Sequence, residues 1–134
     1  MLAQTAREPF DSKERLFELK LDGVRCIAYL DTVTRLQGRS GQDITAQFPE
    51  LHCLHRQVSS PCILDGEIVC EDFQAVTRRV HKTKALDIRV AQRLYPARYF
   101  AFDLLNVRRE SLMSLAQRAR KVTLNGVMSQ SPQG

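Results

Sequence analysis

Apolar and polar residues alternate along several short stretches of the chain with the two-residue period of a β-strand. This alternation, together with short apolar runs and β-branched and aromatic residues, predicts strands over residues 16–21, 24–31, 33–37, 62–70 and 97–105. Apolar residues at helical spacing predict helices over 47–58 and 111–121, with Thr45 and Ser111 as N-caps, and helical or turn-rich segments over 73–80 and 86–94. We expect residues 1–13 to be an irregular lead-in and 122–134 a frayed tail. Strands and hairpins dominate, which predicts an α+β fold with antiparallel sheets and flanking helices.

Lys20 lies between two leucines, with Glu18 and Asp22 two positions away on either side. In a strand over 16–21 these three charged side chains would share one face, and the leucines would share the other. Asp22-Gly23 between two apolar runs predicts a tight hairpin turn, because glycine tolerates a positive φ. A lysine placed in this way is either part of a solvated outer face or an amine held for chemistry.

The apolar run over residues 62–70 is interrupted by Asp65-Gly66-Glu67. A buried strand seldom tolerates two carboxylates unless other groups pair with them. One interpretation is therefore a functional site on this strand, and the other is a turn closed by Asp65 and Gly66. Two phenylalanines in the strand over 97–105, Phe100 and Phe102, either belong to the core or face a ligand.

Length and composition are those of one globular domain, with 134 residues and a net charge of +5. A basic chain suits a polyanionic partner, nucleic acid first, and its cations concentrate over residues 78–98 and 108–121. No apolar run is long enough for a membrane span and no signal peptide is expected, so we predict no membrane partner. The four cysteines lack CxxC spacing and are expected to be reduced thiols of a cytoplasmic protein.

A zinc site is the alternative interpretation of His52, Cys53 and His55. The two histidines fall on neighbouring positions at helical spacing. No further paired Cys/His set completes a four-ligand site, so the sequence argues against structural zinc here.

The pattern Lys20-x-Asp22-Gly23-x-Arg25 resembles the nucleotide-binding lysine motif of the covalent nucleotidyltransferases, which are ATP-dependent DNA ligases, RNA ligases and mRNA capping enzymes. The residue types suit the chemistry that the resemblance implies. A lysine amine attacks the α-phosphate of ATP only when unprotonated, and desolvation with nearby cations disfavours the ammonium form. An arginine nearby can hold ribose or phosphate with its planar fork.

Other segments follow in the order found in the adenylation domain of ATP-dependent DNA ligases. Gly38-Arg39-Ser40-Gly41 with Phe48-Pro49-Glu50-Leu51 is similar to the family's second motif and the helix after it, although the usual Ser-Arg-Asn-Gly is changed. Residues 64–69 are similar to its Asp-Gly-Glu motif and residues 99–105 to its aromatic motif. The resemblance runs from about Pro9 to Leu115 and implies a partial ATP-grasp-like nucleotidyltransferase fold.

By this resemblance Lys20 is the adenylated nucleophile and the only catalytic residue carried over. The resemblance implies that the ATP- or AMP-binding residues are Glu18, Leu19, Lys20, Arg25, Arg39, Glu67 and Phe102. It also implies ATP and Mg²⁺ as cofactors and nicked double-stranded DNA as the partner, with no metal ligand assigned among the retained motifs.

Each implied role suits its residue type. Glu18 reads the adenine amino edge, and Arg25 and Arg39 contact ribose, phosphate or the nucleic-acid end. Glu67 accepts hydrogen bonds from the ribose hydroxyls, and Phe102 stacks on adenine. Without the resemblance, Arg39 is equally well explained as a solvated turn residue.

The family's two later motifs, a Glu-Gly-x-x-x-Lys segment and a Lys-x-Lys pair, are not matched. Residues 125–130 look like a worn version of the first, and residues 106–110 replace an Asp-Gly-containing turn. No Lys-x-Lys or oligonucleotide-binding-fold domain follows. We therefore expect one partial adenylation domain over 1–134 with an open sheet edge: a fragment, a truncated product, or a chain whose missing motifs come from a separate chain.

Three functions follow from these observations. The favoured one is the adenylation portion of an ATP-dependent DNA ligase that forms lysyl-AMP and passes AMP to a DNA 5′-phosphate at a nick. The second is a catalytically impaired nucleotide- or DNA-binding remnant. The third is an RNA-ligase or capping-type nucleotidyltransferase.

Overall fold

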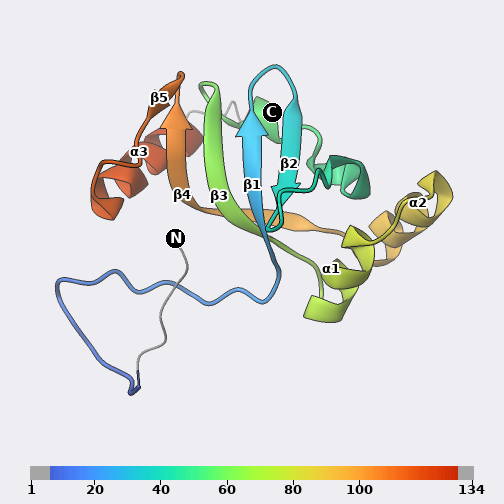
Figure 1. Ribbon diagram of the computed structural model, residues 1–134, viewed down its shortest axis with the longest axis horizontal. Helices are drawn as coiled ribbons and strands as arrows, with labels where there is room; N and C mark the ends of the chain where they lie inside the picture. Colours follow the sequence, from blue (N-terminus) through green and yellow to red (C-terminus); the bar gives the residue numbers. More distant parts are fainter. Residues whose placement is uncertain (1–6, 130–134) are drawn as a thin grey trace.

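One antiparallel sheet organises the part of the chain that the computed structural model describes, residues 7–129 (Figure 1). Its strands lie in the order β2-β1-β3-β4-β5, so the α+β class with an antiparallel sheet is confirmed. The strands are β1 (Val24–Leu30), β2 (Thr34–Gly38), β3 (Cys62–Val69), β4 (Arg98–Val107) and β5 (Glu110–Ser111). The first four of these strands lie close to stretches that the sequence pattern predicts as strands.

The predicted strand over residues 16–21 is wrong, because residues 7–23 contain no strand. Both edges of β1 are already paired, with β2 on one side and β3 on the other. A preceding hairpin strand would therefore find no partner. Its apolar residues are exposed instead, and Leu19 is 85% exposed.

The predicted helix over 47–58 is replaced by three short 3₁₀ turns, η1 (Thr45–Gln47), η2 (Pro49–Leu51) and η3 (Leu54–Gln57). Proline disfavours the α conformation in the residue before it, and Phe48 adopts φ −129° and ψ 67°. Thr45 is not a helix N-cap, since its hydroxyl accepts a hydrogen bond from the Leu36 N–H at 2.8 Å.

Three α-helices complete the described part of the chain: α1 (Phe73–Val80), α2 (Ala85–Leu94) and α3 (Gln117–Ser129). α1 and α2 confirm the helical prediction for residues 73–80 and 86–94. α3 begins later and ends later than predicted, and Ser111 lies in β5 rather than at an N-cap. Residues 122–129 are helical and not frayed, because Leu124 and Val127 are buried in the core. The rest of the expected tail, residues 130–134, lies outside the described residues.

The core lies on one face of the sheet, where α3 and the 3₁₀ turns supply apolar side chains. Strand residues Cys26, Ala28, Leu30, Leu36, Leu64 and Ile68 point into it and meet Ile44, Phe48, Val76, Leu124 and Val127. In the view of Figure 1, α3 lies behind β4. Strand residues alternate between faces, so the opposite face of β1 and β3 carries Arg25, Ile27, Tyr29, Asp65, Glu67 and Val69. The two charged residues of the predicted site that lie on these strands, Arg25 and Glu67, are therefore on the face away from this core.

The turn between β4 and β5 contains two non-glycine residues with positive φ. Arg108 and Arg109 have φ values of 49° and 71°, the left-handed region that glycine and asparagine favour. Each non-glycine residue there costs about 1–2 kcal/mol. Arg108 offsets part of this by donating its N–H to the Pro61 carbonyl at 2.8 Å and its Nε to Ser60 Oγ at 3.1 Å.

None of the helices in residues 7–129 has the length and apolar character needed to cross a bilayer.

Candidate functional site

The lysine segment, residues 18–25, is anchored to β3 at Gly23. The Gly23 N–H donates a hydrogen bond to Glu67 Oε1 at 3.2 Å. A Cβ at Gly23 would lie 2.2 Å from the Ile68 carbonyl oxygen, so only glycine lets the backbone approach this closely. The predicted tight turn with positive φ is wrong, since Gly41 is the one glycine in residues 7–129 with a positive φ. Gly23 serves close packing rather than a turn.

Arg25 is fixed on β1 by a two-pronged ion pair with Asp65 of β3. Its Nε lies 3.0 Å from Oδ1 and its Nη2 lies 2.6 Å from Oδ2. The hydrogen bond to Asp65 raises the pKa of the Arg25 guanidinium. Asp65 is buried inside β3, so the alternative in which it closes a turn with Gly66 is wrong. The guanidinium stays partly exposed, and its position is set before any ligand arrives.

Glu67 lies in the same cross-strand row as Arg25 and Phe100. The register pairs Arg25 with Glu67 and Glu67 with Phe100, and we call these three residues the central row. Burial raises the pKa of the Glu67 carboxyl, against the lowering effects of the Gly23 hydrogen bond and the Arg25 charge. The two carboxylates that interrupt this apolar strand therefore have the partners that the sequence required.

The raised pKa of Glu67 predicts how the free energy of unfolding depends on pH. The folded state keeps a proton on this carboxyl at pH values where the unfolded chain has lost it. Its contribution to the free energy of unfolding therefore falls as the pH rises from the ordinary pKa through the raised one. We expect Glu67→Gln to remove this decline, measured as the difference from wild type in urea unfolding between pH 4 and pH 7. The matched control is Glu71→Gln, on an exposed loop residue, and parallel curves for all three proteins would contradict the prediction.

The two phenylalanines of β4 occupy different environments. Phe100 is 42% exposed in the central row, so it is not a core residue. Phe102 is half-buried and lies in a bulge, because Asp65 pairs with Asp103 while Gly66 pairs with Ala101. Asp103 is held by Arg120 of α3, with its two oxygens 2.8 Å from Nε and 2.7 Å from Nη2. This second ion pair fixes the backbone next to Phe102.

The remaining predicted residues make no common cluster of contacts within residues 7–129; they are Glu18, Leu19, Lys20 and Arg39. Lys20 is exposed and three residues from Gly23, and no ion pair or hydrogen bond of its ammonium is found within residues 7–129. Glu18 forms an ion pair with Lys121 of α3. Arg39 is exposed in the turn after Gly38. Gly38 pairs with Cys26 of β1, and Cys26 pairs in turn with Gly66 of β3. Glu18, Lys20 and Asp22 do not share a strand face, because no strand forms here.

Sequence reasoning missed the contribution of α3. Arg120 and Lys121 reach Asp103 and Glu18, which are 17 and 103 positions away in the chain. The only signal in the sequence is the pair of basic residues at 120–121. This pair belongs to the basic stretch over residues 108–121, but the sequence does not indicate which carboxylates it contacts.

The histidines of the zinc alternative have other contacts. The Nε2 of His52 lies 2.8 Å from the Thr45 carbonyl oxygen, and the Nδ1 of His55 lies 3.1 Å from Thr34 Oγ1. Residues 7–129 hold no group of three or more His, Cys, Asp or Glu side chains arranged to bind a metal. Burial also raises the pKa of the Cys26 and Cys62 thiols to about 12 and about 11, so these thiols are protonated and unreactive.

One face of this antiparallel sheet holds a fixed arginine and a carboxylate next to the Lys-x-Asp-Gly-x-Arg segment, which fits the nucleotidyltransferase resemblance of the sequence. Residues 1–134 match the family model described as ATP dependent DNA ligase domain, and the chain belongs to this family.

Relatives and solved structures agree with the family. The chain is 30% identical to the SPbeta prophage-derived DNA ligase-like protein LigB of Bacillus subtilis, over 98% of this chain and 48% of the relative. It is 31% identical to DNA ligase C1 of Mycolicibacterium smegmatis, over 81% and 34%. A mycobacterial DNA ligase D complexed with ATP and MES has a similar structure, with a TM-score of 0.62 and 28% identity over 84% of this chain and 37% of that one. The chain thus spans half or less of the length of these proteins.

Proposed function

We propose that this chain is the adenylation portion of an ATP-dependent DNA ligase and that Lys20 carries AMP. The observation that carries the proposal is the anchoring of the lysine segment in a chain of this family. Gly23 is bonded to Glu67 and Arg25 to Asp65, so both ends of the Asp-Gly-x-Arg stretch are held against β3 beside Lys20.

The proposed reaction has three steps. The deprotonated Lys20 Nζ attacks the α-phosphorus of ATP, a P–N bond forms, and the P–O bond to pyrophosphate breaks. The AMP group then passes to a DNA 5′-phosphate, which frees the lysine, and a 3′-hydroxyl at the nick displaces AMP as the strand is sealed. Arg25 and Arg39 hold phosphate or ribose, and the Glu67 oxygen not bonded to Gly23 accepts from the ribose hydroxyls.

The adenine site that we propose combines Glu18, Leu19 and Phe102. Glu18 Oε1 is paired with Lys121 of α3, and the other carboxylate oxygen of Glu18 is the acceptor for the adenine amino group. Phe102 offers a ring that the Asp103–Arg120 pair holds in place through the adjacent backbone.

The donor set fits ATP, which needs cations for its phosphates and an acceptor for its ribose. For Mg²⁺ the carboxylates in residues 7–129 do not form a protein-only site, which fits an ion bound mainly through nucleotide phosphates and water. When bound, such an ion neutralises negative charge on the phosphates. Nicked double-stranded DNA is the proposed partner, and the net charge of +5 supports a polyanion.

Labelling with ATP tests this function. We expect the protein with Mg²⁺ and ATP radiolabelled at the α-phosphate to acquire an acid-labile covalent label, which chases onto nicked DNA. Unlabelled ATP should compete for labelling, and GTP should not. Preferential competition by GTP would indicate a capping-type enzyme. A folded protein that binds ATP in equilibrium dialysis without any label would instead be a binding remnant.

A further inference from the structure

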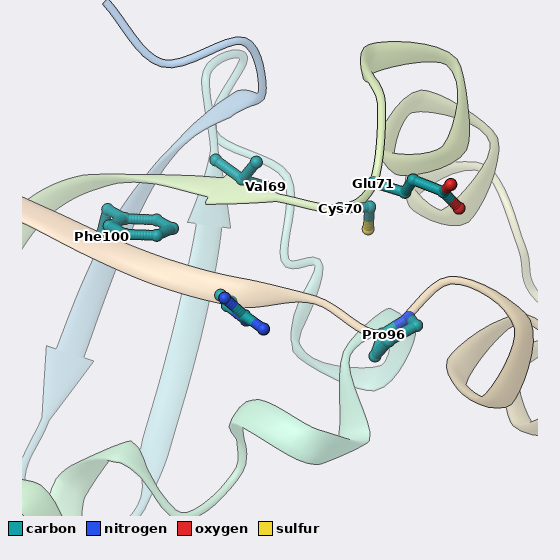
Figure 2. A pocket seen from close by; sticks show the side chains of 6 residues that line it. Val69, Cys70, Glu71, Pro96 and Phe100 are labelled. Atoms are coloured by element: carbon teal, nitrogen blue, oxygen red, sulfur yellow. The ribbon is translucent and has the colours of Figure 1, made fainter. Parts of the chain in front are cut away.

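A hollow that the proposed adenylation chemistry does not use lies beside the central row, where β3 ends and β4 begins. It has a volume of about 350 Å³ and is lined by Val69, Cys70, Glu71, Pro96, Arg98 and Phe100. Figure 2 shows Val69 and Phe100 on neighbouring strands, with Cys70 and Pro96 towards the other end of the hollow.

The sheet register places this hollow next to the site of the lysine segment. Glu67 pairs with Phe100, and Val69 pairs with Arg98, so the hollow runs from the row of Glu67 to the end of β3. Residues two apart on a strand share a face, which puts Arg98 and Phe100 on the same side of β4. Phe100 therefore lines the hollow, while Phe102, the ring of the proposed adenine site, lies in the bulge two positions further along.

The walls of the hollow combine an aromatic surface with one available cation. Phe100 is 42% exposed, and Val69 and Pro96 add apolar surface. Arg98 is exposed, and its guanidinium has no hydrogen bond or ion pair within the part of the chain that the structure describes. Glu71 places the opposing charge on the loop after β3. A ligand of this hollow should therefore have one flat ring and one anionic group on the side of Arg98.

An unpaired nucleobase with its phosphate has this chemistry. Bases stack on aromatic side chains whatever their identity, and arginine binds the adjoining phosphate. A volume of about 350 Å³ lies at the lower end of small-molecule pockets, so it suits one base and not a longer segment.

We propose that the chain also binds breaks that leave a base unpaired, and that this hollow holds that base, stacked on Phe100, with a phosphate bound to Arg98. The proposal rests on the proposed function, because it adds a DNA contact to the adenylation site. It also assigns a different ligand to each of the two phenylalanines of β4: Phe102 stacks on the adenine of ATP, and Phe100 stacks on a DNA base.

Fluorescence anisotropy with two labelled duplexes tests the proposal. One duplex carries a single unpaired thymidine at a one-nucleotide gap, and the other carries an abasic residue there. We expect wild-type protein to bind the thymidine duplex about 5- to 150-fold more tightly, the range for one stacked base. Phe100→Ala should abolish this difference. Arg98→Ala should weaken binding to both duplexes and reduce the salt slope between 50 and 200 mM NaCl by about one unit.

The controls separate this site from the ATP site. Phe73→Ala removes a similarly exposed ring on α1 and should leave the base preference intact. Phe100→Leu keeps an apolar side chain over the strand, so a changed preference in this variant is not explained by misfolding. It lacks a ring for stacking and should also abolish the base preference. Covalent labelling by ATP should persist in both Phe100 variants. An unchanged base preference in Phe100→Leu, or loss of ATP labelling in that folded variant, would overturn the proposal. Loss of labelling in wild type would instead contradict the proposed function.

Discussion

Replacement of Lys20 by alanine is expected to abolish covalent labelling by ATP, a fall of at least about 10³-fold to the limit of detection. The reason is that the amine supplies the bond to the α-phosphorus, and no neighbouring group can replace it. Lys20→Arg should fail equally, because a guanidinium does not lose its proton at usable pH. The measurement is autoradiography of a denaturing gel run without acid treatment, at saturating ATP, with nucleotide binding followed separately by calorimetry.

Lys84→Ala is the matched control for Lys20. Lys84 is also an exposed lysine, at the residue before α2, and its side chain makes no capping hydrogen bond. Its replacement should leave labelling unchanged. Lys20→Ala should retain noncovalent ATP binding, since Arg25 and Glu67 stay in place on the sheet. A Lys20→Ala protein that still forms the adduct would require a different nucleophile.

Strand positions in this fold were predictable wherever a period-two pattern buries one face. β1 and β2 have that pattern, and each contributes side chains to the core. The same pattern over 16–21 led to an error, because alternation reports a side-chain period and does not report whether a neighbouring strand is available. Here the pairing of β1 with β2 and β3 occupies both edges.

The site was predictable to the extent that burial forces polar groups to pair. Two carboxylates within an apolar strand required partners, and the structure supplies Arg25 for Asp65 and the Gly23 N–H for Glu67. The part played by α3 could not be foreseen, since it depends on where the helix begins. A start at residue 117 rather than 111 determines which basic residues face β4.

Arg79→Met is expected to lower the free energy of unfolding by about 3–5 kcal/mol, because it leaves a carboxylate unpaired in the interior. Arg79 is 1% exposed and forms a two-pronged ion pair with Glu50, whose Oε2 lies 2.9 Å from Nη2. Its guanidinium also donates to the carbonyls of Tyr95 and Gln47 at 2.8 Å and lies 4.7 Å from the Phe48 ring centroid. One side chain thus ties α1 to the 3₁₀ turns and to the start of β4.

The protonation of Glu50 determines how the loss of stability in Arg79→Met depends on pH. Burial alone would raise the pKa of Glu50, but the hydrogen bonds from Arg79 and from the Ala97 N–H outweigh it and lower the pKa. The pair therefore stabilises the fold above the ordinary pKa of the carboxyl and loses this contribution as the pH falls through the lowered one. The penalty of Arg79→Met, measured by urea unfolding, should accordingly shrink towards acid pH.

Two further variants make the Arg79 experiment decisive. Arg78→Met changes the preceding arginine, whose exposed side chain hydrogen-bonds only to Gln74 within residues 7–129, and should cost under about 0.5 kcal/mol. The double variant Arg79→Met with Glu50→Gln removes the unpaired charge and should recover part of the loss. Equal penalties for Arg78→Met and Arg79→Met would mean that the buried guanidinium does not hold these elements together. In that case the packing of Phe48 and Val76 alone would have to join α1 to the core of the sheet.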